Sequence, residues 1–179
     1  MKLKKLIEDY DIEAVLISSK YSLRYFTGFT GTTGIALAFA EKRFFFTDFR
    51  YVVQAKEQVE PNGFTVVKVE RGAIDTLAEY IKNSGVKKLG VEDKHVTIAE
   101  YSDYKSKFGD INFVSLGDSL EKMRMIKRED EIDKIKKAVE IADEVFKLVV
   151  PEIKEGVTEK YLSNFMEYHM KRLGGEGPS

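Results

Sequence analysis

The sequence contains no cysteine, and its 179 residues include no tryptophan and only two histidines. Without cysteine the chain has no disulfide framework, no thiolate nucleophile and no cysteine-ligated metal site. His95 and His169 lie far apart along the chain, so they do not form the histidine cluster that a metal site would need. We therefore predict no metal site built from cysteine or clustered histidine within this sequence.

An excess of charge of one sign is also lacking. Lysine and arginine number 29 and aspartate and glutamate 30, so the formal net charge is −1 at pH 7. No basic field indicates nucleic acid as a partner. No window approaches the length of a membrane span, and the first residues, MKLKKLIEDYDIE, become acidic too early for a secretory signal. We therefore expect no nucleic-acid or membrane partner, and a cytoplasmic location.

Strand-like and helix-like patterns alternate over the first part of the chain. Short apolar runs of strand length occupy residues 12–17, 34–39, 43–47, 64–69, 88–91 and 111–114. Helical spacing separates them, and Thr97 with Glu100 fits a capping box. Ala40–Lys42 has the length of a hairpin connection. This alternation, with one antiparallel hairpin inside it, predicts an α/β fold: a mixed sheet of five to six strands with helices on both faces.

The hairpin and its exit are the most distinctive part of this pattern. A run as apolar as Phe44–Phe46 is hard to leave half exposed, so we expect its strand to lie centrally and to be covered on both faces. Asp48 follows this strand and is expected to cap the next helix. Arg50, two residues on, has two interpretations: a partner for a carboxylate such as a substrate terminus, or a local salt bridge.

The character of the chain changes near Gly117. From Met123 onward the pattern is helical only, and two helices are predicted, the first stopped by Pro151 and the second capped by Thr158. The predicted organisation is a first domain at 1–118, a linker at 119–127, and the two C-terminal helices within 128–179.

The candidate functional segment is a glycine-spaced aromatic loop that begins at Tyr25. Glycines permit tight backbone and keep a loop mobile at low cost, while aromatic side chains offer apolar contact. The alternative is a structural connection whose aromatic residues belong to the core. The candidate residues of this loop are Tyr25, Phe26, Gly28, Phe29, Thr30 and Gly31.

Four segments, in order, resemble the creatinase and prolidase family, the "pita-bread" metallopeptidases and their non-peptidase relatives. Arg24–Phe29, the hairpin and Thr47–Tyr51 resemble its amino-terminal domain, which has a ribonuclease-H-like fold. Met123–Lys127, followed by Glu131-Ile132, is similar to its linker into the catalytic domain. Glu155–Glu159 and Gly175–Ser179 resemble segments just inside that domain.

The resemblance carries several expectations. Family metallopeptidases bind two divalent metals, manganese or cobalt, through two Asp, one His and two Glu, and all five positions would lie beyond Ser179. The resemblance therefore implies no catalytic residue and no metal ligand within this sequence. The resemblance also implies a homodimer in which the aromatic loop approaches the active site of the neighbouring subunit.

Two classes of function remain open. In the first, the chain is the front part of a proline-specific metallopeptidase, a dipeptidase or aminopeptidase acting on proline-containing peptides, and shapes the substrate entrance and the dimer. In the second, it is a non-catalytic binding or dimerisation module of a peptidase-like protein. Creatinase-type amidinohydrolase activity is a variant of the first class. In either class, residues 1–179 alone are expected to be inactive.

Overall fold

The computed structural model describes residues 2–70 and 72–177 and divides the chain into two compact units, Met1–Met125 and Ile126–Ser179. The first unit contains a six-stranded sheet in the order β4-β3-β2-β1-β5-β6. β2 is antiparallel to both of its neighbours, whereas the β3–β4, β1–β5 and β5–β6 pairs are parallel. The predicted mixed α/β sheet is confirmed. Its strands are Ala14–Ile17 (β1), Ile35–Phe39 (β2), Arg43–Thr47 (β3), Thr65–Lys68 (β4), Lys88–Val91 (β5) and Asn112–Ser115 (β6).

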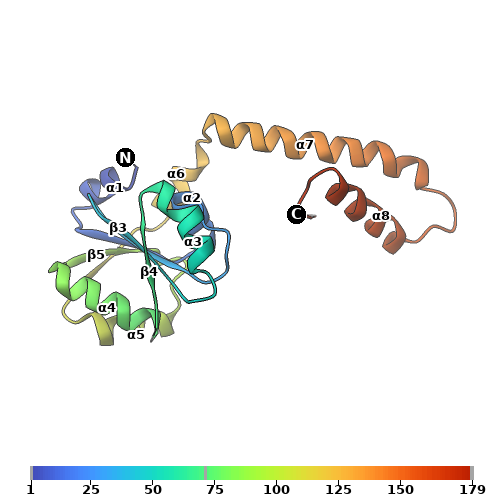
Figure 1. The fold of residues 1–179 in the computed structure, drawn as a ribbon. Coiled ribbons are helices and arrows are strands. Elements are labelled where there is room, and N and C mark those ends of the chain that lie inside the picture. The colour runs from blue at the N-terminus through green and yellow to red at the C-terminus, as the bar shows by residue number, and fades with distance from the viewer. Residues whose placement is uncertain (1, 71, 178–179) are drawn as a thin grey trace. The chain divides into compact units, whose positions relative to one another are not determined.

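Helices cover both faces of this sheet, as expected. Helices α4 and α5 lie on one face (Figure 1), and their apolar residues share one core cluster with the strand residues Leu16 and Phe46. The other core cluster joins α1, α2, α3 and α6 to Val15 and Phe45, because successive strand residues point to opposite faces. The helices are Lys2–Asp9 (α1), Lys20–Thr27 (α2), Val52–Val59 (α3), Ala73–Ser84 (α4), Ile98–Phe108 (α5) and Ser119–Met125 (α6).

The central placement of the phenylalanine run is confirmed. β3 pairs with β2 on one side and β4 on the other, and Phe45 and Phe46 are 0% and 1% exposed. Phe44 and Phe46 pack toward Tyr80 of α4, with ring centroids 5.0 Å away in both cases. A run of three aromatic residues therefore fills both cores, which explains why no polar residue interrupts it.

The segment expected as a linker, 119–127, begins with helix α6. Leu120 on this helix is 2% exposed and belongs to the same core cluster as Leu3 and Leu23. Tyr10 also contacts this helix through its hydroxyl, which lies within hydrogen-bonding distance of Ser119. Residues 119–125 are therefore a packed part of the first unit.

The second unit contains two helices, Glu129–Val149 (α7) and Glu159–Arg172 (α8). α7 ends before Pro151, which lies in a short 3₁₀ turn, and the Thr158 hydroxyl accepts a hydrogen bond from the Tyr161 N–H at 3.2 Å. The predicted stop and cap are both confirmed. Within 2–70 and 72–177, no helix has the length and apolar content that crossing a membrane requires.

Candidate functional site

Helix α2 leads into the candidate loop, and both of its ends are held by side chains or special backbone geometry. Ser19 caps its start by accepting a hydrogen bond from the Ser22 N–H at 3.2 Å. Gly28 ends it with φ of 77°, and its N–H donates to the Arg24 carbonyl at 3.0 Å. A positive φ favours glycine, so Gly28 is required by conformation.

A buried carboxylate at the end of β5 secures the start of α2. Glu92 is 3% exposed. One of its oxygens accepts hydrogen bonds from the backbone N–H groups of Ser18 and Ser19 at 2.9 and 3.0 Å, and the other accepts one from the Ser22 hydroxyl at 2.6 Å. Such charge-assisted bonds satisfy N–H groups that a helix start leaves without an intrahelical partner. These bonds join residues that are 70 to 74 positions apart in the sequence, and they fix where α2, and hence the loop, begins.

Tyr25 and Phe26 belong to α2, so the expectation that the loop opens at Tyr25 is wrong. Tyr25 donates a hydrogen bond from its hydroxyl to the Met123 carbonyl at 3.1 Å and also contacts the Lys2 ammonium group. Phe26 packs against the core, edge-on to the Tyr25 ring. Both side chains therefore anchor the helix within its own unit.

Phe29 is a core residue. Its side chain is 2% exposed, and its ring centroid lies 4.7 Å from that of Phe45 and 5.7 Å from that of Tyr51. This burial favours the structural alternative for Phe29 over an exposed apolar contact. Because the Phe29 ring packs between β3 and the start of α3, these contacts hold the loop against the sheet.

Gly31 and Gly34 are required because there is no room for a side chain at either position. A Cβ atom on Gly31 would lie 2.4 Å from the Phe29 Cζ and 2.9 Å from the Tyr51 Cδ1, and one on Gly34 would lie 2.3 Å from the Phe45 Cζ. Neither residue has a positive φ. These glycines therefore let the chain pass directly over aromatic rings, and the interpretation that they keep the loop mobile is not supported.

Polar contacts hold the outer side of the loop against α3. Thr30 receives hydrogen bonds at its hydroxyl from the side-chain amides of Gln54 and Gln58 at 2.9 and 3.0 Å, and its N–H donates to the Gln58 oxygen at 2.9 Å. The hydroxyls of Thr32 and Tyr51 lie 2.7 Å apart. We call Thr30, Gln54 and Gln58 the loop latch. Its signal in the sequence is a pair of glutamines four residues apart on one helix.

Arg50 forms the local salt bridge. Its Nε and Nη2 donate to the two carboxylate oxygens of Asp48 at 3.0 and 2.8 Å, and its backbone N–H donates to Oδ1 at 2.9 Å. The hydrogen bond from Arg50 lowers the pKa of Asp48, and the same bond raises the pKa of Arg50. The expectation that Asp48 caps α3 is wrong, because α3 begins at Val52 after Tyr51 and the Asp48 oxygens are engaged by Arg50.

Two exposed apolar side chains stand beside this corner. Phe49 is 74% exposed and Val53 71%. Thr30 and Thr32 of the loop are exposed as well. The exposure of Phe49 was not predicted, because the residue follows the buried residues Phe45 and Phe46 in one aromatic stretch.

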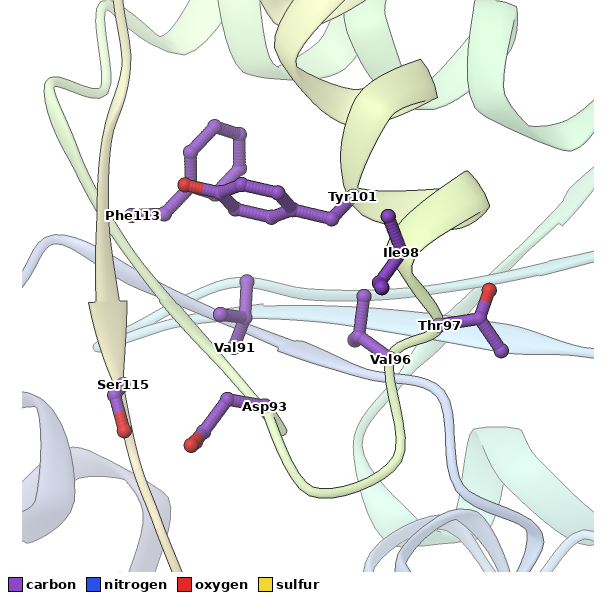
Figure 2. A pocket seen from close by; sticks show the side chains of 8 residues that line it. All are labelled: Val91, Asp93, Val96, Thr97, Ile98, Tyr101, Phe113 and Ser115. Atoms are coloured by element: carbon purple, nitrogen blue, oxygen red, sulfur yellow. The ribbon is translucent and has the colours of Figure 1, made fainter.

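A pocket of about 330 Å³ opens at the carboxyl ends of β5 and β6, beside the start of α5 (Figure 2). Its wall is mainly apolar, with Tyr101 edge-on to Phe113 at 5.4 Å. Burial alone would raise the pKa of Asp93, but hydrogen bonds from the Ser115 hydroxyl and the Gly117 N–H outweigh it and hold the pKa below its ordinary value. The carboxylate is therefore already engaged within the chain.

His95 belongs to the first unit and His169 to the second. His95 lies 3.3 Å from a Glu121 oxygen, and His169 packs on the Phe165 ring at 4.3 Å. In the described part of the chain, no three His, Asp or Glu side chains converge as metal ligands would. The residues present therefore do not fit a metal centre.

Comparison with known proteins matches both parts of the chain to one group of enzymes. The profile of the Creatinase/Prolidase N-terminal domain matches residues 1–126, and that of metallopeptidase family M24 matches 133–179. The uncharacterized peptidase YqhT of Bacillus subtilis is 36% identical over 99% of this chain and 50% of that protein. The chain thus spans about half the length of the curated relatives it matches.

Solved structures agree. A Xaa-Pro dipeptidase from Bacillus anthracis has a TM-score of 0.91 and 35% identity, covering 98% of this chain and 49% of that one. The N-terminal domain of the cytoplasmic peptidase PepQ from Mycobacterium tuberculosis has a TM-score of 0.62 and 31% identity, covering 68% of this chain and 95% of that one. The chain belongs to the creatinase/prolidase family.

Proposed function

We propose that the chain is the N-terminal part of a proline-specific metallopeptidase, and that it borders the substrate entrance without contributing a catalytic residue. The observation that carries this proposal is its similarity, over nearly its whole length, to half of a Xaa-Pro dipeptidase. The order of the two matched segments, the N-terminal domain followed by the start of family M24, supports it further.

The part of the chain proposed to border the entrance is the latched loop together with Phe49 and Val53. We call this part of the chain the rim. A rigid rim excludes long substrates better than a mobile one, because a long substrate cannot push it aside. The packing of Phe29 and the loop latch supply such rigidity. Thr30 and Thr32 are exposed on the outer side of this rim and are the residues proposed to face a peptide or a neighbouring subunit.

The remaining features of the complete protein follow from the same proposal. Two divalent metals, manganese or cobalt, would be held by residues outside this chain, since its described part offers no group of three ligands. We also propose a homodimer, in which the loop of one subunit lies near the active site of the other, and a cytoplasmic location.

The test uses the complete protein loaded with Mn²⁺ and a pair of matched substrates, Ala-Pro and Ala-Ala. We expect hydrolysis of the proline peptide only, and no hydrolysis by residues 1–179 alone under the same conditions. A complete, metal-loaded protein that leaves Ala-Pro intact would favour the non-catalytic module instead.

The entrance role is tested separately on the same protein. Thr32→Trp, which adds bulk to the rim, should lower kcat/KM for a proline-containing tetrapeptide more than for Ala-Pro. Ser106→Trp, an exposed site on α5, is the control and should leave the ratio of the two constants unchanged. Equal effects of both variants on both peptides would contradict the proposal that the loop borders the substrate entrance.

A further inference from the structure

The sequence contains a single Asn-Gly pair, Asn62-Gly63. It lies at the end of the short 3₁₀ turn Glu60–Asn62, which follows helix α3. Glycine has no Cβ, so its backbone nitrogen is less hindered than that of other residues. In an unfolded chain this nitrogen can attack the side chain of a preceding asparagine, and asparagine is accordingly a thermolabile residue type. Asn62 is therefore the asparagine most open to this chemistry once the chain unfolds.

The reaction is deamidation. The Gly63 nitrogen forms a bond to Cγ of Asn62, the bond between Cγ and Nδ2 breaks, and the amide group leaves as ammonia with the proton of the attacking nitrogen. Water then opens the five-membered imide ring at one of its two carbonyls, which gives aspartate or isoaspartate. Water is the only other reactant, and the mass of the chain rises by about 1 Da.

Both residues of the pair are selected by the fold. Gly63 ends the 3₁₀ turn with φ of 79°, in the left-handed region that favours glycine. Asn62 donates hydrogen bonds from Nδ2 to the Thr27 carbonyl at 3.1 Å and to the Gln58 carbonyl at 2.9 Å. Both acceptors are carbonyl oxygens, so this position needs a side chain that donates twice. The reactive pair therefore follows from how the turn is built.

The contacts of the turn oppose the reaction while the chain is folded. Ring closure rotates the Asn62 side chain away from the two carbonyls that hold its amide. The attacking nitrogen is also engaged, because the Gly63 N–H donates to the Glu60 carbonyl at 2.9 Å. Closure further requires the Gly63 nitrogen and the Asn62 Cβ to lie on the same side of the Cα–C bond, which the helical backbone of the turn does not allow. Three hydrogen bonds and the turn itself must therefore break first.

Deamidation would remove an attachment of the candidate loop. Thr27 is the last residue of α2, so its carbonyl lies where the loop begins, and Gln58 belongs to the loop latch. The amide also lies close to the backbone there, since a Cβ on Gly28 would be 2.8 Å from the Asn62 Nδ2. An ionised aspartate at this position has only acceptor atoms, so it would face two carbonyl oxygens that it cannot bind. The end of α2 would then be held less tightly to the end of α3.

We propose that Asn62-Gly63 is a deamidation site that the fold protects and that unfolding exposes, so that a chain which has deamidated refolds to a less stable form. The bonds that protect Asn62 join residues of the first unit, so they do not depend on what the rest of the complete protein covers. The peptidase proposal assigns no role to Asn62 and stands or falls separately.

The first test compares deamidation of residues 1–179 folded and in urea, at the same mildly alkaline pH, by peptide mapping with mass spectrometry. Asn62 should react at least about tenfold more slowly in the folded chain, because three hydrogen bonds hold it. Asn83 is the internal reference and should react more slowly than Asn62 in urea, since the next residue, Ser84, has a Cβ. Equal rates at Asn62 in both conditions, or a faster reaction at Asn83 in urea, would overturn the proposal.

The second test makes the product directly. Asn62→Asp should raise the equilibrium constant for unfolding, measured in urea, at least about tenfold, because two hydrogen bonds are lost and a carboxylate faces two carbonyls. Asn83→Asp makes the same charge change at an exposed position of α4 and should have the smaller effect. An Asn62→Asp variant no less stable than Asn83→Asp would show that the amide holds nothing in place.

The third test links the damage to refolding. Repeated heating above Tm and cooling should convert the chain, cycle by cycle, to a form with a lower Tm, and the species heavier by about 1 Da at Asn62 should accumulate in that form. Asn62→Ser, which keeps a hydroxyl donor but has no amide to lose, should retain its own Tm through the same cycles. A decline in Asn62→Ser as large as in the unchanged chain would assign the loss to other damage and refute the proposal.

Discussion

Replacing Phe29 by alanine tests whether the loop is a packed structure. The ring is 2% exposed and lies between the rings of Phe45 and Tyr51. Truncation of a buried phenylalanine costs about 3–5 kcal/mol of unfolding free energy, through lost transfer energy and the cavity left behind. For a unit of this size, each kcal/mol lowers Tm by roughly 3–5 °C. Phe29→Ala should therefore melt about 9–25 °C below the unchanged chain.

The chain offers a matched control for this measurement. Phe49 is the same residue type, twenty positions on, and is 74% exposed. Phe49→Ala should change the free energy of unfolding by no more than about 0.5 kcal/mol. Thermal melts followed by circular dichroism compare the two directly. Equal melting temperatures for the two variants would refute the packing argument.

A double-mutant cycle with Gly31 tests the contact itself. Gly31→Ala alone should cost about 1–3 kcal/mol, because its Cβ would lie 2.4 Å from the Phe29 Cζ. In the Phe29→Ala background this clash is gone, so the cost of Gly31→Ala should fall by about 1 kcal/mol or more. Additive effects of the two changes would mean that space is not what selects glycine here.

Three further predictions concern the first unit. Glu92→Ala should cost about 3 kcal/mol in urea unfolding, because it leaves buried donors without their acceptor, and Glu92→Gln should cost less. Thr97→Ala should cost about 1 kcal/mol, since the Thr97 hydroxyl accepts from the Glu100 N–H at 3.2 Å. Burial raises the pKa of Tyr104 from 10.0 to about 12, so stability present below pH 10 should fall as the pH rises to 12, and Tyr104→Phe should remove this fall.

Each of these has an outcome that would contradict it. A Glu92→Ala variant as stable as the unchanged chain would mean that water replaces the carboxylate at no cost. A Thr97→Ala loss matched by Ser106→Ala would show no special role for the cap. For Tyr104, the same decline between pH 10 and 12 with phenylalanine in its place would assign the effect to other groups.

The sheet could be predicted from sequence because its signals are local. The run Phe44–Phe46 has no polar interruption, and alternation along 12–17 fills both cores, so strand positions follow directly from apolar patterning. The Thr97 and Thr158 caps were equally readable, since a capping side chain acts within three residues. Where the determinant is short in range, a single sequence suffices.

The conformation of the loop was harder to predict, because it depends on competing local contacts and on contacts with residues distant in the sequence. Asp48 has the side chain of a helix cap, but Arg50 two residues away engages both of its oxygens. Gly28 and Gly31 look alike in sequence, yet one is selected by a positive φ and the other by the Phe29 ring. No local sequence pattern distinguishes the two reasons for glycine, because the position of the Phe29 ring is set by the folded structure.

Glu92 occupies backbone N–H groups at a position where nucleotide-binding α/β folds bind a phosphate. β1 and β5 are adjacent and parallel, and the chain leaves their carboxyl ends toward opposite sides of the sheet. At such a switch point, nucleotide-binding folds hold a phosphate on the N–H groups that begin a helix. Here a carboxylate from the chain itself binds the N–H groups of Ser18 and Ser19. A phosphate ligand would have to displace the Glu92 carboxylate and leave it buried without its hydrogen-bond donors. At this end of the sheet, Glu92 therefore links the end of β5 to the start of α2.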